Sequence, residues 1–200
     1  MKVKFRVYSI SGCARNVTDD GAFTKSTTQL AASWTPSADP ESGIAEYQYS
    51  VGTTIGGTEI RGYTSVSLAT ATTITGLSLV DKTTYYINVR AKNEAGLFSE
   101  ASSNGIKVDT SGPVGVNALT VERSYGSYIS NPFAVLTTSL TDPDGIGVDT
   151  NSCSYTVDGV IWSAATWNSA GSNCKITGLT CTDGQSLAIK MRVSDLLGTP

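Results

Sequence analysis

The chain has 200 residues, of which 40% are hydrophobic and 16% charged, and its formal net charge is −3. These values fit one or two globular domains and argue against an intrinsically disordered chain. They offer no excess of Lys and Arg for binding nucleic acid, and no apolar run approaches the roughly 20 residues of a membrane-spanning helix. The chain has no histidine, which rules out Ser-His-Asp and Cys-His catalysis and histidine-ligated zinc.

The first 21 residues predict a segment of two strands. Val3, Phe5 and Val7 alternate with charged residues, which is typical of a strand, and the segment lacks the apolar core of a signal peptide. A second strand is expected at 15–18. Residues 3–12 resemble 87–96, an offset of 84 positions (87 − 3). We therefore interpret 1–21 as the last two strands of an upstream repeat.

Residues 22–112 predict a complete all-β domain. Apolar and polar residues alternate in short runs that are separated by Gly, Ser, Thr, Asn, Asp and Pro, the pattern of a β-sandwich. The expected strands cover 30–34, 45–52, 59–65, 71–74, 84–92 and 106–109.

The spacing of aromatic and aliphatic residues in this domain carries a resemblance. The pattern is Leu30-x-x-x-Trp34, then Tyr47-x-Tyr49-x-Val51, then Leu77, then Tyr85-x-Ile87-x-Val89-x-Ala91-x-Asn93. Over about 22–113 it resembles a fibronectin type III domain. The resemblance implies that Trp34 is a core tryptophan and that the hydroxyl of Tyr85 bonds to the backbone of the preceding loop. The loop at 39–44 is similar to those of modules in large microbial surface proteins.

Residues 113–200 predict a second sandwich, with strands at 134–140, 154–159, 175–176 and 187–194. Residues 74–96 recur without gaps at 176–198, an offset of 102 positions (176 − 74), which indicates repeated domains. This half resembles an immunoglobulin-like domain of large, repeat-containing bacterial or archaeal surface proteins. It departs from the first domain in lacking a tryptophan on its second strand, and Leu187 replaces the corner tyrosine.

The phase of the repeat leads to a hypothesis of assembly. The second domain is expected to lack its last strand. Residues 1–21 correspond to the last two strands of a repeat, so they could supply the missing one. Strand addition between copies, repeated head to tail, would make a filament. The alternative is that 1–200 is a stretch of a longer multidomain chain.

The four cysteines, Cys13, Cys153, Cys174 and Cys181, form no CxxC pair. Their number favours disulfides and an oxidising compartment, with buried free thiols as the alternative. Cys153 and Cys174 precede strands that start at the same end of the sandwich, so we expect a bridge between them. A Cys174–Cys181 bridge is the competing pairing.

Asp142, Asp144 and Asp149 form the densest carboxylate cluster and lie in one expected loop. Carboxylate oxygens at this density can bind calcium, although Asp-Pro-Asp-Gly is also a good turn sequence. The loop at 39–44 is the equivalent, weaker candidate in the first domain. No other cofactor is expected.

Two carbohydrate-related activities, glycoside hydrolysis and sugar binding, would depend on other residues. Asp19 and Asp20 are adjacent, so they do not supply the facing carboxylates of a glycosidase. Tyr63, Trp162 and Trp167 could form a platform for stacking sugars, but Trp162 and Trp167 would face opposite sides of one continuous strand. At least one of these two tryptophans is therefore expected in the core.

The predicted function is non-catalytic: an extracellular or cell-surface stalk, adhesin or filament module. The expected partners are other copies of the chain, neighbouring sandwich domains, and cell-surface glycans or proteins. The alternative is a carbohydrate-binding accessory module of a secreted enzyme.

Overall fold

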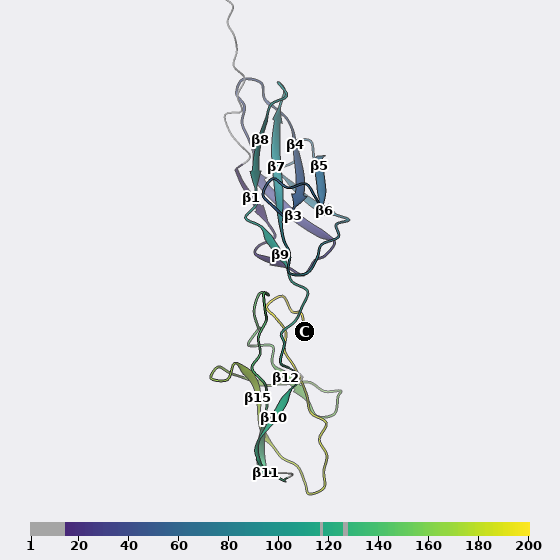
Figure 1. The fold of residues 1–200 in the computed structure, drawn as a ribbon, viewed down its shortest axis with the longest axis vertical. Coiled ribbons are helices and arrows are strands. Elements are labelled where there is room, and N and C mark those ends of the chain that lie inside the picture. The colour runs from purple at the N-terminus through teal and green to yellow at the C-terminus, as the bar shows by residue number, and fades with distance from the viewer. Residues whose placement is uncertain (1–14, 117, 126–127) are drawn as a thin grey trace, which may run out of the picture. The chain divides into compact units, whose positions relative to one another are not determined.

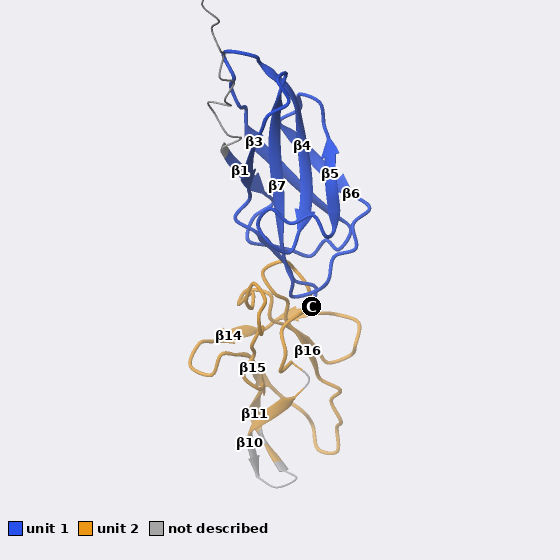
Figure 2. Ribbon diagram, turned by 45° about the horizontal axis from the view of Figure 1, so that its top comes forward, with its two compact units in different colours: residues 1–110 blue, residues 111–200 orange. Residues whose placement is uncertain are grey.

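The computed structural model describes residues 15–116, 118–125 and 128–200, which divide into two compact units, Met1–Thr110 and Ser111–Pro200 (Figure 2). Every regular element in these ranges is a β-strand (Figure 1). Consequently, the described part of the chain has no helix long and apolar enough to cross a membrane. The predicted all-β class is confirmed.

The first unit is a sandwich of two sheets. One sheet has the order β1-β3-β6, and the other has the order β2-β9-β7-β4-β5, with β8 also paired to β7. The strands are β1 (Arg15–Asp19), β2 (Phe23–Thr24), β3 (Gln29–Thr35), β4 (Ile44–Gly52), β5 (Arg61–Ser65), β6 (Ala71–Thr75), β7 (Thr84–Asn93), β8 (Phe98–Ser102) and β9 (Ile106–Val108).

Alternation along β3 and β7 builds the core of this unit. Tyr85, Ile87, Val89 and Ala91 lie on one face of β7 and are at most 1% exposed, because successive strand residues point to opposite faces. They pack in one hydrophobic cluster with Leu30 and the other buried residues of β3. Period-two apolar patterning in the sequence therefore becomes the contact between the two sheets.

The strand at Arg15–Asp19 corrects the expected organisation of the amino terminus. It is β1 of the first sandwich, antiparallel to β3, and its Val17 belongs to the core. The sequence pattern instead predicts that this strand belongs to an upstream repeat, as part of a donor segment. A short strand with one buried side chain has the same local sequence pattern whether it pairs within its own domain or with another one. Only its pairing partner, β3, shows to which domain it belongs. The strand expected at Val3–Val7 lies outside the described residues.

The last strand of the first unit is split, a feature that the sequence pattern does not predict. β8 pairs with residues 88–92 of β7 and β9 pairs with residues 84–85. Between them Gly105 has a φ of +94°, and a Cβ there would come within 2.8 Å of the Tyr86 ring. Glycine is therefore required where the chain passes from β8 to β9.

The second unit also has two sheets, with the orders β10-β11-β15-β14 and β13-β12-β16. The strands are β10 (Leu119–Tyr125), β11 (Tyr128–Thr137), β12 (Ser154–Thr156), β13 (Ser163–Ala164), β14 (Thr166–Asn168), β15 (Asn173–Leu179) and β16 (Lys190–Arg192). β16 pairs with β12 and lies at one edge of its sheet. The hairpin of β10 with β11 was not predicted.

Candidate functional site

Trp34 and Tyr85 have structural roles. Trp34 is 5% exposed in the core, and its ring lies 5.9 Å from that of Tyr47. The hydroxyl of Tyr85 accepts the N–H of Val80 at 2.9 Å, which is the backbone bond implied by the fibronectin type III resemblance. These two aromatic residues support the fold of the first unit and are buried from any ligand.

Asp39, in the first unit's counterpart of the predicted calcium loop, has both carboxylate oxygens occupied. Oδ1 accepts the N–H groups of Glu41 and Ser42 at 3.0 and 3.1 Å. Oδ2 accepts the Ser42 hydroxyl at 3.0 Å and Nδ2 of the buried Asn93 at 2.8 Å. The bond from Asn93, followed by those from the loop, lowers the pKa of Asp39. This carboxylate therefore fastens its loop to β7.

Asn88 is a second buried polar residue of β7, and it is absent from the residues singled out in the sequence. Its Nδ2 donates to the Gly57 carbonyl at 2.8 Å, and its Oδ1 accepts the Gly56 N–H at 2.7 Å and the Ser102 hydroxyl at 2.6 Å. These bonds hold the β4–β5 loop against β7 and β8. The available sequence signal for this buried role was an asparagine in the middle of a strand, on the face opposite to the apolar residues.

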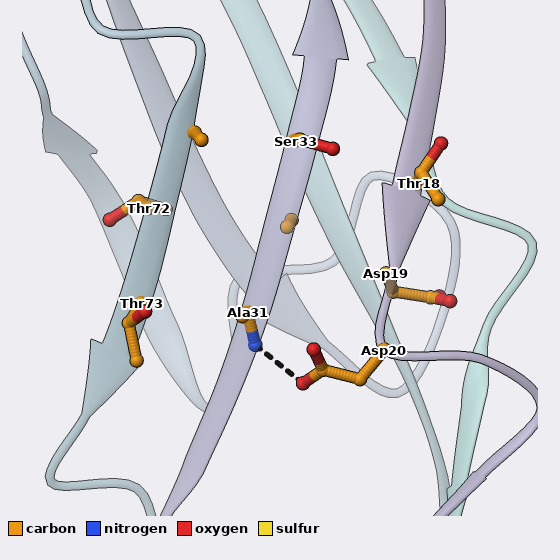
Figure 3. Close-up of a pocket in the computed structure, with 9 residues that line it drawn as sticks. Thr18, Asp19, Asp20, Ala31, Ser33, Thr72 and Thr73 are labelled. Carbon is orange, nitrogen blue, oxygen red and sulfur yellow. Dashed lines mark hydrogen bonds between the residues drawn. The ribbon is translucent and has the colours of Figure 1, made fainter.

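Asp19 and Asp20 line the shallow hollow over the sheet β1-β3-β6 (Figure 3). Asp20 accepts the Ala31 N–H at 2.8 Å, whereas Asp19 accepts the Gly21 N–H at 3.2 Å. Figure 3 shows the two carboxylates pointing to opposite sides of the chain. They do not face each other across a cleft, as the carboxylates of a glycosidase must.

Trp162 and Trp167 lie beside or within strands of different sheets of the second unit. Trp167 is in β14 and packs against the hydrophobic core. Trp162 precedes β13, and the guanidinium of Arg192 lies 4.1 Å from the centre of its ring. In the first unit the ring of Tyr63 is covered in the same way by Arg90, at 3.7 Å. Trp162 and Trp167 thus form no continuous stacking platform, and Tyr63 belongs to the other unit.

Trp162 nevertheless borders an apolar hollow. A depression of about 330 Å³ lies beside it. Its lining residues are Val116, Leu119, Trp162, Ile189, Lys190 and Met191. The combination of an indole, aliphatic side chains and one ammonium group can accommodate a small ligand.

The hairpin at 156–161 is organised by Asp158. Its Oδ1 accepts the N–H groups of Val160 and Ile161 at 2.8 and 2.9 Å and the hydroxyl of Thr156 at 2.8 Å. These bonds lower the pKa of Asp158 to about 2, and the bond from the Val160 N–H has the largest effect. The turn presents Val160 and Ile161 to solvent, with 78% and 69% of their surface exposed.

The three acids predicted to bind calcium do not converge. Oδ2 of Asp142 accepts the Gly147 N–H at 2.7 Å. Asp144 is exposed, at a φ of +63°, and Oδ1 of Asp149 accepts the Asn151 N–H at 2.9 Å. Among the described side chains of this unit, the acid brought close to Asp142 is Asp195, with carboxylate oxygens within 4.8 Å. Sequence reasoning missed Asp195 because it lies 53 positions away (195 − 142).

Cys153 and Cys174, the pair expected from the sequence, form a disulfide with a Cα–Cα distance of 5.7 Å. It joins the start of β12 to β15, and therefore one sheet to the other. Cys181 is a free, half-buried thiol whose Sγ lies 3.8 Å from Oδ1 of Asn131. The competing Cys174–Cys181 pairing is wrong. Cys13 lies outside the described residues.

The topology defines both units as immunoglobulin-like β-sandwiches. No protein-family model matches the chain, and no curated protein does. Its similarity to solved structures is low in sequence identity. The central fibronectin-III array of RIM-binding protein is 16% identical, with a TM-score of 0.35, over 92% of this chain and 64% of that one. The FN1–FN3 domains of chicken CNTN1 are 14% identical, with a TM-score of 0.33, over 94% and 61% of the two chains.

Part of an enzyme chain is similar at the same level. The α-L-rhamnosidase of Dictyoglumus thermophilum is 12% identical, with a TM-score of 0.41, over 75% of this chain and 19% of that one. The chain thus spans about a fifth of the rhamnosidase and less than two thirds of either fibronectin array.

Proposed function

We propose that the chain is a non-catalytic, load-bearing spacer or adhesive module of an extracellular or cell-surface protein. The observation that carries the proposal is the parallel pairing of β2 with β9. In sequence, β2 lies near the start of the first unit and β9 near its end. The Lys107 N–H donates to the Ala22 carbonyl at 2.9 Å, and the Asp109 N–H donates to the Thr24 carbonyl at 2.8 Å.

This pairing resists tension along the chain. A force that pulls the segment before β2 away from the segment after β9 loads the two parallel strands in shear. The hydrogen bonds between them then carry the load together, whereas bonds pulled open from one end break one after another. The geometry suits a domain that transmits force between its neighbours in a tandem array.

The disulfide supports the proposed location. Disulfides form and persist outside the cytosol in most organisms, and this one staples the two sheets of the second unit. The proposed partners are neighbouring sandwiches, further copies of the chain, and glycans or proteins of a cell surface.

Single-molecule force spectroscopy tests the load-bearing role. Lys107→Pro removes the N–H that bonds to Ala22 and leaves the Val108 N–H bonded to Thr83 on the other side of β9. We expect this variant to unfold at a clearly lower force than the native chain. Lys107→Ala keeps the backbone N–H and is the matched control, expected to unfold at the native force. Equal forces for all three proteins would refute a β2–β9 shear contact.

The proposed assembly by strand donation requires β1 to leave its own sheet. Because Val17 is part of the first core, donation of 15–19 to another copy would expose apolar surface in the donor. Light scattering of the purified chain tests the idea. Polymers that persist in reductant would support strand exchange, whereas a monomer of 20.9 kDa would refute it.

The second candidate function is carbohydrate binding by the second unit, favoured by the hollow beside Trp162. Retention on an insoluble polysaccharide tests it. Trp162→Ala should reduce retention at least tenfold in a protein that remains folded. Tyr63→Ala, in the other unit, is the control and should leave retention unchanged.

A further inference from the structure

Asp195 has a buried carboxylate oxygen that accepts no hydrogen bond from the described residues. The residue is 1% exposed. Its Oδ1 accepts the N–H groups of Leu197 and Thr199 at 2.8 and 2.7 Å, while its Oδ2 is buried and unpartnered. An ionised carboxylate in such a place is costly unless something neutralises it.

Asp39 of the first unit shows what a carboxylate in a structural role looks like in this chain. There, two backbone N–H groups also bond to Oδ1, and Ser42 and Asn93 additionally satisfy Oδ2. In Asp195 the equivalent of those last two donors is missing among the described residues. Closing a turn therefore explains the hydrogen bonds to Oδ1 of Asp195. It does not explain why Oδ2 is buried without a hydrogen-bond donor.

A second acidic group of the same unit increases the cost. A carboxylate oxygen of Asp142 lies within 4.8 Å of one from Asp195, and like charges at this separation repel. The backbone keeps the two side chains together, because the Leu196 N–H donates to the Gly147 carbonyl at 3.0 Å and Val148 bridges to Asp195. The fold thus holds two carboxylates close, with one buried oxygen unsatisfied.

We propose that Asp142 and Asp195 bind a divalent cation, with calcium as the preferred ion. Calcium accepts six to eight oxygen ligands at about 2.3–2.6 Å, so two oxygens on one ion can lie about 5 Å apart. The observed separation meets this limit without rearrangement. Backbone carbonyls and water complete the shell. Magnesium, with shorter bonds of about 2.0–2.1 Å and stricter octahedral geometry, fits a site on two loops less well.

The cation joins the loop at 142–149 to the turn at 195–199. Both segments are irregular, and they meet through few backbone bonds, so an ion shared by Asp142 and Asp195 stiffens this end of the second sandwich. With only two carboxylates, the affinity falls in the range of extracellular calcium modules, a dissociation constant of about 10⁻⁴–10⁻³ M. This site is independent of the proposed load-bearing contact in the first unit.

Amide NMR spectra of the full chain, recorded during titration with CaCl₂ to 10 mM, test the proposal. The N–H groups of Gly147, Leu197 and Thr199 bond to the two ligating carboxylates, so their resonances should shift and saturate. Sodium chloride at matched ionic strength controls for screening, and MgCl₂ measures the selectivity.

Asp195→Asn is the decisive variant. Its amide oxygen can still accept the two turn N–H groups, so the turn is retained while the charge is removed. We expect calcium binding to weaken at least tenfold, and the same in Asp142→Asn, which serves if Asp195→Asn fails to fold. Asp144→Asn, in the same loop but exposed, should bind within twofold of the native chain. A native chain without saturable shifts overturns the proposal, as does less than a tenfold loss in the variants of Asp195 and Asp142.

Discussion

The disulfide between Cys153 and Cys174 should account for a large part of the stability of the second unit. It closes a loop with a sequence separation of 21, for which the chain-entropy relation gives about 3 kcal/mol at 25 °C. A unit of this size loses about 4–8 °C of melting temperature per kcal/mol. Replacing both cysteines with alanine should therefore lower the melting temperature of the second unit by roughly 10–25 °C.

Differential scanning calorimetry of the full chain provides the assay, because the two units give an internal comparison. No cysteine lies among the described residues of the first unit, so its transition should stay in place. Reduction of the native protein should move the second transition in the same direction as the Cys153→Ala/Cys174→Ala variant. Cys181→Ser leaves the bridge intact and should change the transition by less than 2 °C.

Two results would refute this reasoning. If the double variant melts with the native chain, neither the bridge nor the packing of its two sulfurs stabilises the second unit. If both transitions fall together on reduction, the units do not unfold independently and the loss cannot be assigned to this loop.

Three further predictions concern buried bonds and one titrating group. Tyr85→Phe removes the acceptor of the Val80 N–H and should lower the free energy of unfolding of the first unit by about 1–2 kcal/mol, measured by urea denaturation. Asn88→Ala leaves several buried donors and acceptors unpaired and should cost about 2–4 kcal/mol in the same assay. The folded-state pKa of Asp158 is about 2, below its ordinary value of 3.8, so its stabilising effect is present above pH 3.8 and is lost as the pH falls through 2. The second unit should therefore become less stable between pH 4 and 2, and Asp158→Asn should reduce this dependence in acid-unfolding curves.

Each of these has its own contrary outcome. Tyr86→Phe, at the neighbouring position of β7, is the control for Tyr85→Phe, and an equal loss in both would mean that the Val80 bond is unimportant. For Asn88, an unchanged urea midpoint would show that water replaces the lost bonds. For Asp158, an unchanged acid-unfolding curve in the asparagine variant would assign the acid sensitivity of the second unit to other carboxylates.

The positions of β3 to β7 and of β9, and the hydrophobic core of the first unit, follow from the sequence. Alternation along a strand is set by the backbone pleat, so the buried set around Tyr85 could be predicted from period two. The bond from Val80 to Tyr85 spans only five positions and is implied by the family pattern. In the second unit, predicted strand positions were sufficient to place Cys153 and Cys174 at the same end of the sandwich.

Strand partners and the meeting of distant loops were decided only by the tertiary structure. A single buried valine cannot indicate whether Arg15–Asp19 pairs within its own sandwich or with another copy, because both pairings bury the same side chain. The sequence leaves open whether Trp162 and Trp167 share one strand. In the structure Trp167 lies in β14, whereas Trp162 directly precedes β13 of the other sheet.

The calcium prediction shows the same division. The sequence predicts a calcium loop of Asp142, Asp144 and Asp149, but Asp144 is exposed and Asp149 caps a turn, so the three acids do not converge. Asp195 comes beside Asp142 because the segment that follows β16 pairs with the loop at 142–149. Local patterns determine which residues can form strands and turns, whereas proximity between residues far apart in sequence depends on how the sheets pack.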